Sequence, residues 1–258
     1  MNDVVIIGLG QLGGVFAHGL LRTGARVTPV RRSDDMHVIA DEVPSPLAVL
    51  VAVGEGDLQA VLEAMPAPWA SRVVLLQNEL LPPSWNTLKH SPTVAVVWFE
   101  KKKPIAAHPI QSTPIAGPNA ARFVDALMAL DLPAHVIEDD ALCEALVVKN
   151  VYILTANIAG LSLSEGATTG GLASAEGELF ERVALEALSL QRATLRASGV
   201  PFDASDESIL DAVRAAMMAD ADHKLRGRSA PARLARALED AKRFEIEVPE
   251  MQRIANSN

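Results

Sequence analysis

The sequence predicts an α/β protein in which a doubly wound parallel sheet is followed by an all-α C-terminal domain. Up to about residue 137, short β-branched apolar runs alternate with amphipathic segments, which is typical of strands and helices that build a parallel sheet. From residue 138 onward the chain is rich in Ala, Leu, Glu and Arg and follows a helical period only. A glycine-rich turn near the N-terminus is the third observation. We therefore predict two domains, residues 1–137 and 138–258.

The N-terminal segment contains the most informative motif. An apolar run at residues 4–7 has the length and β-branching of a buried strand, and a helical pattern over residues 15–21 follows it. A second short strand is expected at residues 26–30. The chain between the first strand and the helix reads Gly8-Leu9-Gly10-Gln11-Leu12-Gly13, which is a G-x-G-x-x-G pattern. This order of elements is typical of a Rossmann-type dinucleotide-binding domain, so we predict that residues 8–13 bind the cofactor.

Each glycine of this motif has a physical role. Gly8 permits a tight turn, Gly10 lets the backbone approach a pyrophosphate, and Gly13 lets the helix and the strand pack closely. The helix N-terminus adds N–H groups without helical partners and a partial positive charge, both of which favour phosphates.

The residues after the second strand indicate which cofactor is bound. Domains that prefer NAD carry an acid near the end of this strand, whereas an Arg accommodates the 2′-phosphate of NADP. Here Arg31 and Arg32 follow the strand, and the first acids are Asp34 and Asp35. Guanidinium groups present paired donors that match phosphate oxygens. The alternative is a pair of solvated arginines at a strand end, but the pattern favours NADP(H), with Arg31 and Arg32 as its ligands.

Composition narrows the class of protein. The 258 residues carry a formal net charge of −9, which disfavours nucleic acid as a partner, and 49% hydrophobic residues are typical of a globular protein. The only cysteine, Cys143, excludes an intramolecular disulfide, and the six histidines show no metal-ligand spacing. Neither a signal peptide nor a membrane span is recognisable. We expect a cytoplasmic protein with a small-molecule substrate, without a metal or a membrane partner.

The other elements follow from the same patterns. In the first domain, strands are expected at 47–53, 73–76, 94–99 and 135–137, a short strand at 37–39, edge strands within 105–115, and helices after residue 58 and at 119–130. In the second domain, helices are expected at 139–162, 174–198, 205–226 and 231–243, with a short one after Pro249. The glycine-rich piece at 160–177 is predicted to be a functional loop.

Three further polar residues are candidates for chemistry. Asn78 follows the strand at 73–76, where ligands of parallel sheets bind, although Asn also stabilises turns. Lys149 lies in a strongly apolar helical run, so its side chain either extends to solvent or faces the active site. A desolvated Lys with a lowered pKa can donate a proton to a carbonyl oxygen as hydride arrives. Asn157 lies two helical turns further on, about 80° around the helix, and so can border the same site.

These residues together resemble the ketopantoate reductase family. The resemblance rests on the glycine turn, Arg31, Asn78, and Lys149 followed by Asn157, with further likeness at Thr169-Gly170-Gly171-Leu172 and Glu245-Ile246-Glu247-Val248-Pro249. It implies an NADPH-dependent reductase of a small 2-keto acid such as 2-dehydropantoate, with a Rossmann domain and a helical domain for substrate binding and dimerisation. It also implies that Lys149 is the general acid, Asn157 a substrate contact, and Asn78 a contact of cofactor and substrate.

The chain also departs from the family pattern. Ile153 stands where a second Asn is expected one turn after Lys149, and no Glu accompanies Ser229, which fits a helix cap before Pro231. Three alternatives therefore stay open: a reductase of ketopantoate or of another keto acid or imine, a protein that binds NADP(H) without turnover, and a relative of the β-hydroxyacid dehydrogenases and imine reductases. Helix exchange between subunits is common in the last group, and a homodimer is an open alternative as well.

Overall fold

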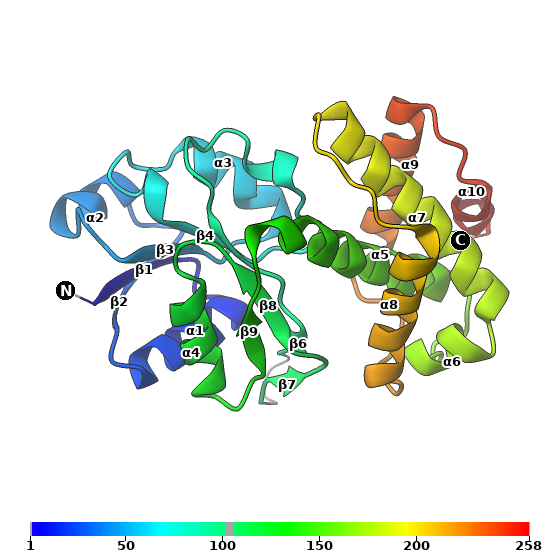
Figure 1. The fold of residues 1–258 in the computed structure, drawn as a ribbon, viewed down its shortest axis with the longest axis horizontal. Helices are drawn as coiled ribbons and strands as arrows, with labels where there is room; N and C mark the ends of the chain where they lie inside the picture. Colours follow the sequence, from blue (N-terminus) through cyan, green and yellow to red (C-terminus); the bar gives the residue numbers. More distant parts are fainter. Residues whose placement is uncertain (1, 102–105, 258) are drawn as a thin grey trace. The chain divides into compact units, whose positions relative to one another are not determined.

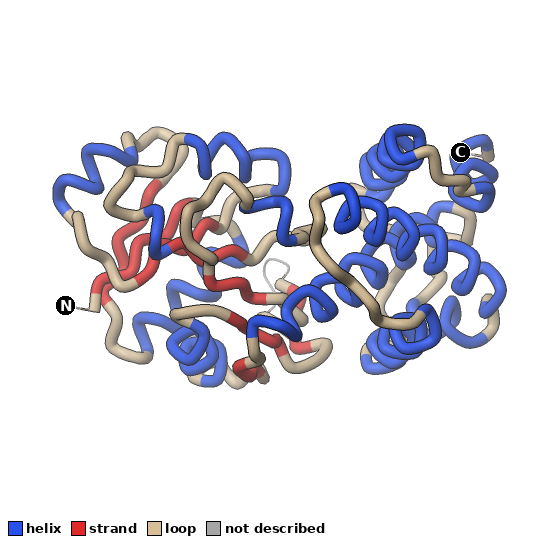
Figure 2. The backbone as a smooth tube through the Cα atoms, turned by 45° about the horizontal axis from the view of Figure 1, so that its top comes forward, coloured by secondary structure: helices blue, strands red, loops and turns tan. Residues whose placement is uncertain are grey.

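The computed structural model describes residues 2–101 and 106–257, and the chain divides into two compact units, Met1–Leu142 and Cys143–Asn258 (Figure 1). The division falls at the first residues of a long helix, slightly later than the sequence suggests. In the described chain, all strands belong to the first unit, and the second unit is built from helices (Figure 2).

The first unit is organised around a seven-stranded sheet with the order β2-β1-β3-β4-β5-β8-β9. Its strands are β1 (Asp3–Ile7), β2 (Arg26–Val30), β3 (Ala48–Val51), β4 (Val73–Leu75), β5 (Thr93–Ala95), β8 (Thr113–Ala116) and β9 (Ala134–Val136). Strands β1 to β5 run parallel, whereas β8 pairs antiparallel with β5 and parallel with β9. Every residue of β1, β3 and β4 is buried, as expected for a sheet that is covered on both faces.

Helices cover both faces of this sheet, so the predicted doubly wound α/β fold is confirmed. Helices α1 (Gln11–Arg22) and α4 (Ala120–Met128) lie on one face, and α2 (Met36–Glu42) and α3 (Leu58–Glu63) lie on the other (Figure 1). Phe16 of α1 packs against Phe123 of α4, with ring centroids 5.8 Å apart. A Cβ at Gly19 would lie 2.1 Å from the Ala126 carbonyl oxygen, so the close approach of α1 to α4 requires a glycine there. Short 3₁₀ helices are η1 (Glu55–Asp57), η2 (Ala70–Arg72), η3 (Pro82–Trp85) and η4 (Asp139–Ala141).

The strand predicted at residues 37–39 is wrong, because these residues belong to helix α2. The Asp35 carboxylate accepts a hydrogen bond from the His37 N–H at 2.8 Å and thereby caps this helix. A capping residue followed by Met36 is a local signal for a helix, and it outweighs the short apolar run that suggested a strand.

The strand predicted at residues 94–99 is divided into β5 and β6 (Phe99–Glu100). Between them, the Trp98 N–H donates to Thr113 Oγ1 at 3.0 Å. β6 pairs with β7 (His108–Pro109) in a separate two-stranded sheet. β7 is an outer strand, as expected for residues 105–115, but β8 (Thr113–Ala116) lies between β5 and β9, so the expectation of an edge strand is wrong there. Ile105 itself lies outside the described residues.

The second unit confirms the predicted series of helices, with several ends displaced. It contains α5 (Leu142–Leu161), α6 (Thr169–Ser174), α7 (Gly177–Ala197), α8 (Asp206–Ala219), α9 (Ala230–Phe244) and α10 (Pro249–Asn256). α7 packs against α6, α8, α9 and α10. α8 ends seven residues before residue 226, the predicted end. The predicted loop at 160–177 contains α6, which the Thr168 side chain caps by accepting from the Gly171 N–H.

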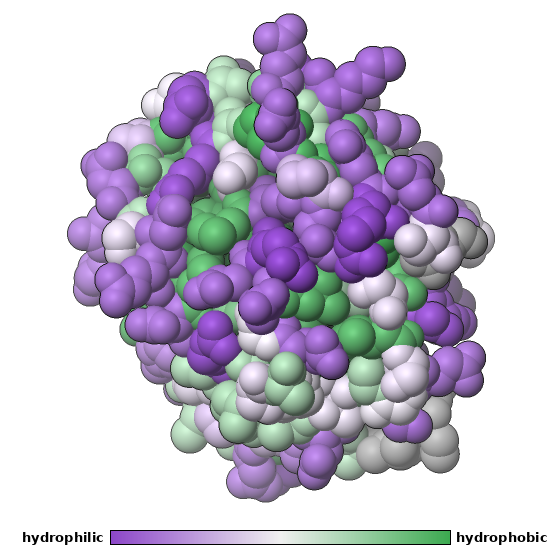
Figure 3. Space-filling view, turned by 90° about the vertical axis from the view of Figure 1, so that its right-hand side faces the viewer, coloured by the Kyte–Doolittle hydropathy of each residue, from purple (hydrophilic) through white to green (hydrophobic). Residues whose placement is uncertain are grey.

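Helix α5 is the apolar centre of the second unit. By length and composition alone it could cross a membrane, although no membrane span was expected. However, 67% of its most apolar window is buried inside the structure, as is typical of a core helix. Hydrophilic side chains surround smaller apolar patches on the face shown in Figure 3.

Candidate cofactor and catalytic sites

The glycine turn follows β1 at the carboxyl edge of the sheet. Gly8 has a φ of +92°, and its N–H donates to the Val30 carbonyl oxygen at 3.0 Å. A Cβ at Gly8 would lie 2.8 Å from the Ala52 carbonyl oxygen, and a Cβ at Gly13 would lie 2.2 Å from the Gly8 carbonyl oxygen. The fold of the turn therefore requires both glycines.

Gly10 differs, because the space beside it is open. Among the described residues, no heavy atom that would contact a Cβ at Gly10 lies within 4 Å. Gly10 is also the N-cap of α1, whose first turn contains no acidic residue. Leu9 and Gln11 are exposed, and Leu12 is half-buried. Open space beside a helix N-terminus fits the phosphates of a dinucleotide, which need close approach to backbone N–H groups.

The segment after β2 is organised by the Asp34 carboxylate. Its Oδ2 accepts from the Arg31 N–H at 2.8 Å, and its Oδ1 accepts from the Ser33 hydroxyl at 3.3 Å. The Arg31 and Arg32 side chains are exposed, and Arg32 Nη2 lies 2.9 Å from Asp57 Oδ2. An exposed ion pair of this kind contributes at most about 1 kcal/mol, so a phosphate can displace the carboxylate. The sequence did not indicate that the Asp57 carboxylate would compete with a phosphate for Arg32.

The end of β4 is joined to the end of β3. Gln77 is buried, and its Nε2 donates to the Val51 carbonyl oxygen at 2.6 Å. Asn78 follows in a turn and is half-buried. Glu79 has a left-handed backbone with a φ of +60°, which costs a non-glycine residue roughly 1–2 kcal/mol. This strained turn was not predicted, because nothing in the local sequence marks Glu79 as unusual.

The predicted cofactor residues of the first unit thus lie along one edge of the sheet. β2, β1, β3 and β4 are parallel neighbours, and the glycine turn, Arg31 with Arg32, and Asn78 all follow their carboxyl ends. This is the edge at which open parallel sheets bind their ligands.

Lys149 lies inside the helical unit and does not extend to solvent. It is 8% exposed, and its Nζ lies 5.4 Å from the centroid of the Tyr152 ring. Burial, with a smaller contribution from the Arg233 guanidinium, lowers the pKa of Lys149 from its ordinary 10.5 to about 7. Both protonation states are therefore populated near neutral pH, as a group that exchanges protons during turnover requires.

Asn157 connects α5 to the segment before α9. Its Nδ2 donates to the Ile153 carbonyl oxygen at 2.8 Å, and its Oδ1 accepts from the Gly227 N–H at 3.1 Å. Both polar ends of the side chain thus have partners inside the helical unit. The predicted substrate contact stays a prediction, and the structure gives Asn157 a clear structural role.

Arg233 is a buried cation that sequence reasoning missed. It is 8% exposed, and its Nη1 donates to the Ser229 hydroxyl at 2.8 Å. Ser229 occupies the predicted N-cap position of α9, directly before Ala230 and Pro231, but its side chain makes no capping hydrogen bond to the helix backbone. The sequence did contain an indication that Arg233 is buried, because this residue falls on the apolar face of its helix. The other residues of that face, Ala230, Leu234, Ala237 and Ala241, are all buried.

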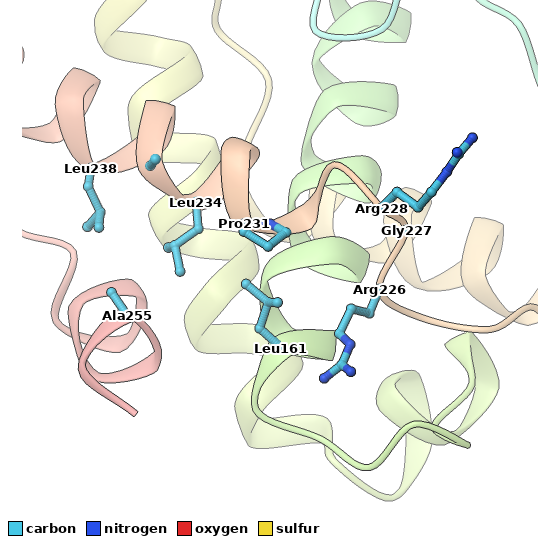
Figure 4. A pocket seen from close by; sticks show the side chains of 9 residues that line it. Leu161, Arg226, Gly227, Arg228, Pro231, Leu234, Leu238 and Ala255 are labelled. Atoms are coloured by element: carbon cyan, nitrogen blue, oxygen red, sulfur yellow. The ribbon is translucent and has the colours of Figure 1, made fainter. Parts of the chain in front are cut away.

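A cavity of about 680 Å³ in the helical unit contains none of the predicted site residues (Figure 4). Its walls are mainly apolar side chains of α9, together with Leu161, Ala255 and the segment 226–228. In Figure 4, the Arg226 side chain lies beside Leu161, whereas the Arg228 side chain extends away from Leu161 and Pro231. Among residues 2–101 and 106–257, no group of His, Cys, Asp or Glu side chains could hold a metal ion.

The fold and these sites define a class of two-domain proteins, in which a Rossmann-type domain precedes an all-helical domain. Within that class, the chain has the fold of the ketopantoate reductases, which confirms the predicted resemblance at the level of the fold. No family model and no curated protein sequence matches the chain.

Three solved structures illustrate this likeness. The 2-dehydropantoate 2-reductase from Methylococcus capsulatus has a TM-score of 0.66 and 17% identity, covering 99% of this chain and 95% of that chain. A dimeric ketopantoate reductase from Staphylococcus aureus has a TM-score of 0.62 and 15% identity, covering 99% and 96%. A D-mandelate dehydrogenase, solved with NADH and anilino(oxo)acetate, has a TM-score of 0.63 and 11% identity, covering 98% and 96%.

Proposed function

We propose that the protein is an NADPH-dependent reductase of a small 2-keto acid, either 2-dehydropantoate or a related substrate. The observation that carries this proposal is Lys149, a buried lysine whose pKa is lowered to about 7. Structures of the same fold support it, since two are named as reductases of ketopantoate and a third, a D-mandelate dehydrogenase, was solved with NADH and anilino(oxo)acetate.

The residues of the first unit fit a dinucleotide. The open space at Gly10 and the N-terminus of α1 suit the pyrophosphate, and Arg31 and Arg32 suit a 2′-phosphate. Asn78 would contact the nicotinamide end. When bound, NADPH supplies the hydride for the carbonyl carbon of the substrate.

Lys149 supplies the proton in this proposal. Its protonated amine donates to the carbonyl oxygen, where negative charge develops during reduction. The lysine is then neutral, and a pKa near 7 lets it regain a proton from water before the next turnover. Asn157 would act by holding the segment at Gly227 and, as the resemblance implies, by contacting the substrate.

The preference for NADPH leads to a prediction about Asp57. In the Asp57→Asn variant, Arg32 loses its carboxylate neighbour and one negative charge disappears near the 2′-phosphate site. We expect NADPH to bind roughly fivefold more tightly, because about 1 kcal/mol of repulsion is removed. Calorimetry with NADPH and NADH measures this, and NADH is the control. Equal changes for both cofactors would contradict placement of the 2′-phosphate at Arg32.

The function itself is tested by following NADPH oxidation with a panel of 2-keto acids, including 2-dehydropantoate. We expect turnover with at least one acid and slower turnover when NADH replaces NADPH. Tight binding of NADPH without oxidation by any keto acid or imine would instead favour a protein that binds the cofactor without turnover.

We further propose that the protein is a cytoplasmic homodimer, with the helical unit binding substrate and forming the dimer contact. A dimeric ketopantoate reductase of the same fold supports this. Sedimentation of the full chain at micromolar concentration is expected to give twice the monomer mass of 27.4 kDa, and a monomer would contradict it.

A further inference from the structure

We infer that the cavity of about 680 Å³ in the helical unit binds an aliphatic carboxylate, with the carboxylate at Arg226 and the aliphatic chain along α9. The inference goes beyond the proposed function, because no residue assigned to the cofactor or to the keto acid lines this cavity. Its volume falls within the range of about 300–1,000 Å³ that is usual for small-molecule sites.

The first argument is the apolar wall of the cavity. Residues of α5, α9 and α10 all contribute to it, so three helices border the cavity (Figure 4). Its apolar residues are Leu161, Pro231, Leu234, Ala235, Leu238 and Ala255. From Pro231 to Leu238 the helix rises by roughly 10 Å, at about 1.5 Å per residue. An aliphatic chain of this length would follow the wall, and each of its methylene groups that leaves water would add to the affinity.

The second argument is the positive charge that Arg226 places in this cavity. Its side chain lies beside Leu161 in Figure 4 and is 37% exposed, so a ligand can reach it. Arg226 Nη2 lies 3.5 Å from Oε1 of Glu165, whose side chain is 92% exposed. That distance exceeds the roughly 2.7–2.9 Å of a close charge-assisted hydrogen bond. The ion pair is therefore weak, and the carboxylate of a ligand can replace Glu165.

The backbone around Arg226 is held in place by contacts within the helical unit. Arg226 has a left-handed backbone with a φ of +65°. The Gly227 N–H donates to Asn157 Oδ1 at 3.1 Å, and a Cβ at Gly160 of α5 would lie 2.9 Å from the Arg226 nitrogen, so this segment packs directly on α5. A cation on a backbone that is already ordered loses less conformational entropy when a ligand binds.

The third argument is the charge of the surrounding segment, which selects an anion. The chain as a whole has a net charge of −9, yet residues 223–238 contain five Lys or Arg residues and no Asp or Glu. The N-terminus of α9, whose first turn has no acidic residue, adds a partial positive charge. A positive region on an acidic protein raises the local concentration of anions. A ligand with an anionic head and an apolar chain therefore matches both parts of the cavity.

Calorimetry with decanoate and with decan-1-ol, which has the same chain length but no charge, tests the inference on the full chain. We expect decanoate to bind at least about tenfold more tightly than decanol, because a hydrogen bond to a charged group is stronger than one between neutral groups. Decanoate that does not bind, or that binds no better than decanol, would overturn the inference.

The role of Arg226 is measured with Arg226→Met, which keeps an unbranched apolar side chain and removes the charge. Decanoate should then bind about tenfold more weakly, whereas decanol should bind as in the wild type. Arg228→Met is the matched control, because Arg228 is exposed and its side chain extends away from Leu161 and Pro231 in Figure 4. Equal weakening in both variants would refute Arg226 as the carboxylate site. If Arg226→Met fails to fold, Arg226→Gly decides by the same comparison, since glycine adopts a positive φ without strain.

The competing carboxylate gives a prediction of opposite sign. In Glu165→Gln the ion pair with Arg226 is lost, so decanoate should bind about threefold more tightly and decanol equally well. Unchanged decanoate binding in this variant would contradict placement of the carboxylate at Arg226.

The apolar wall is tested by filling the cavity. Ala235 is exposed and lines the cavity, so its replacement with Phe should weaken decanoate and decanol alike, by at least about tenfold. Ala232→Phe adds the same ring at an exposed position of α9 outside the lining and should leave both affinities unchanged. A second copy of the chain is the other occupant to consider. If Ala235→Phe instead shifts the sedimentation equilibrium towards the monomer while decanoate binds neither protein, the inference is refuted.

These measurements need neither NADPH nor a keto acid, which separates them from the proposed function. Selective decanoate binding in a protein that reduces no keto acid would support this inference while the proposed function fails. Turnover of a keto acid by a wild type that does not bind decanoate would refute this inference and leave the proposed function intact.

Discussion

Replacing Lys149 with Met is expected to lower kcat for keto acid reduction by about 10²–10⁴-fold without changing the dissociation constant of NADPH. Loss of a general acid has an effect of this size, and the residues proposed to bind the cofactor belong to the other unit. Met has about the length of the aliphatic part of the lysine side chain and is apolar, so packing around Tyr152 is retained. Steady-state kinetics and calorimetry with NADPH measure the two quantities, and Lys224→Met, at an exposed position, is the matched control.

The same substitution is expected to stabilise the fold. Below about pH 7, Lys149 of the wild type is protonated in both the folded and the unfolded protein. Burial of its charge then lowers the free energy of unfolding by up to about 4–5 kcal/mol. Between about pH 7 and 10.5 the unfolded chain holds the proton and the folded chain does not, so wild-type stability rises with pH. Lys149→Met should therefore be more stable than the wild type at pH 6. Its free energy of unfolding should also lack the increase between about pH 7 and 10.5. If it unfolds more easily and is inactive for that reason, Lys149 is structural and not catalytic.

Replacing Gly10 with Val is expected to weaken NADPH binding by at least 100-fold while the thermal midpoint stays within about two degrees of the wild type. The backbone at Gly10 has a φ of −68° and a ψ of −161°, at the edge of the extended region that residues with a Cβ occupy, and the neighbouring space is open in the described chain. The side chain would occupy the volume that the pyrophosphate needs. Calorimetry and thermal unfolding measure the two effects.

Two neighbouring glycines are the controls for this experiment. Gly14→Ala also adds a methyl group in open space, but within the helix, so we expect normal NADPH binding and a gain of about 0.5–1 kcal/mol. Gly13→Ala should prevent folding of the turn, because its Cβ would lie 2.2 Å from the Gly8 carbonyl oxygen. Normal NADPH binding by Gly10→Val would show that the phosphates lie elsewhere.

Elements of the first unit were predictable where the signal was local. The apolar runs of β1 and β3 and the glycine turn need only their neighbours in sequence to be recognised. The direction of β8 was not predictable, because it depends on its pairing with β5 across more than a dozen residues. Helix α2 was missed because three apolar or aromatic residues outweighed the capping signal at Asp35.

In the candidate sites, too, features that depend on neighbouring residues were predictable, and features that depend on distant residues were not. Lys149 was predicted because a lysine within an apolar helical run is conspicuous in the sequence. The partners of Arg233 and Asn157 could not be inferred, since Gly227 lies 70 residues from Asn157 along the chain and meets it only in the folded unit. The ion pair of Arg32 with Asp57 is also non-local, and it lowers the affinity expected at the proposed 2′-phosphate site.

The role of Lys149 as proton donor is tested most directly by the pH dependence of kcat/KM for NADPH-dependent keto acid reduction between pH 5.5 and 9.5. Because the donor must be protonated, the wild-type value should fall tenfold per pH unit above about pH 7, while Lys149→Met should show low activity without this fall. A wild-type value that stays constant across this range, or a fall that persists unchanged in Lys149→Met, would contradict the assignment.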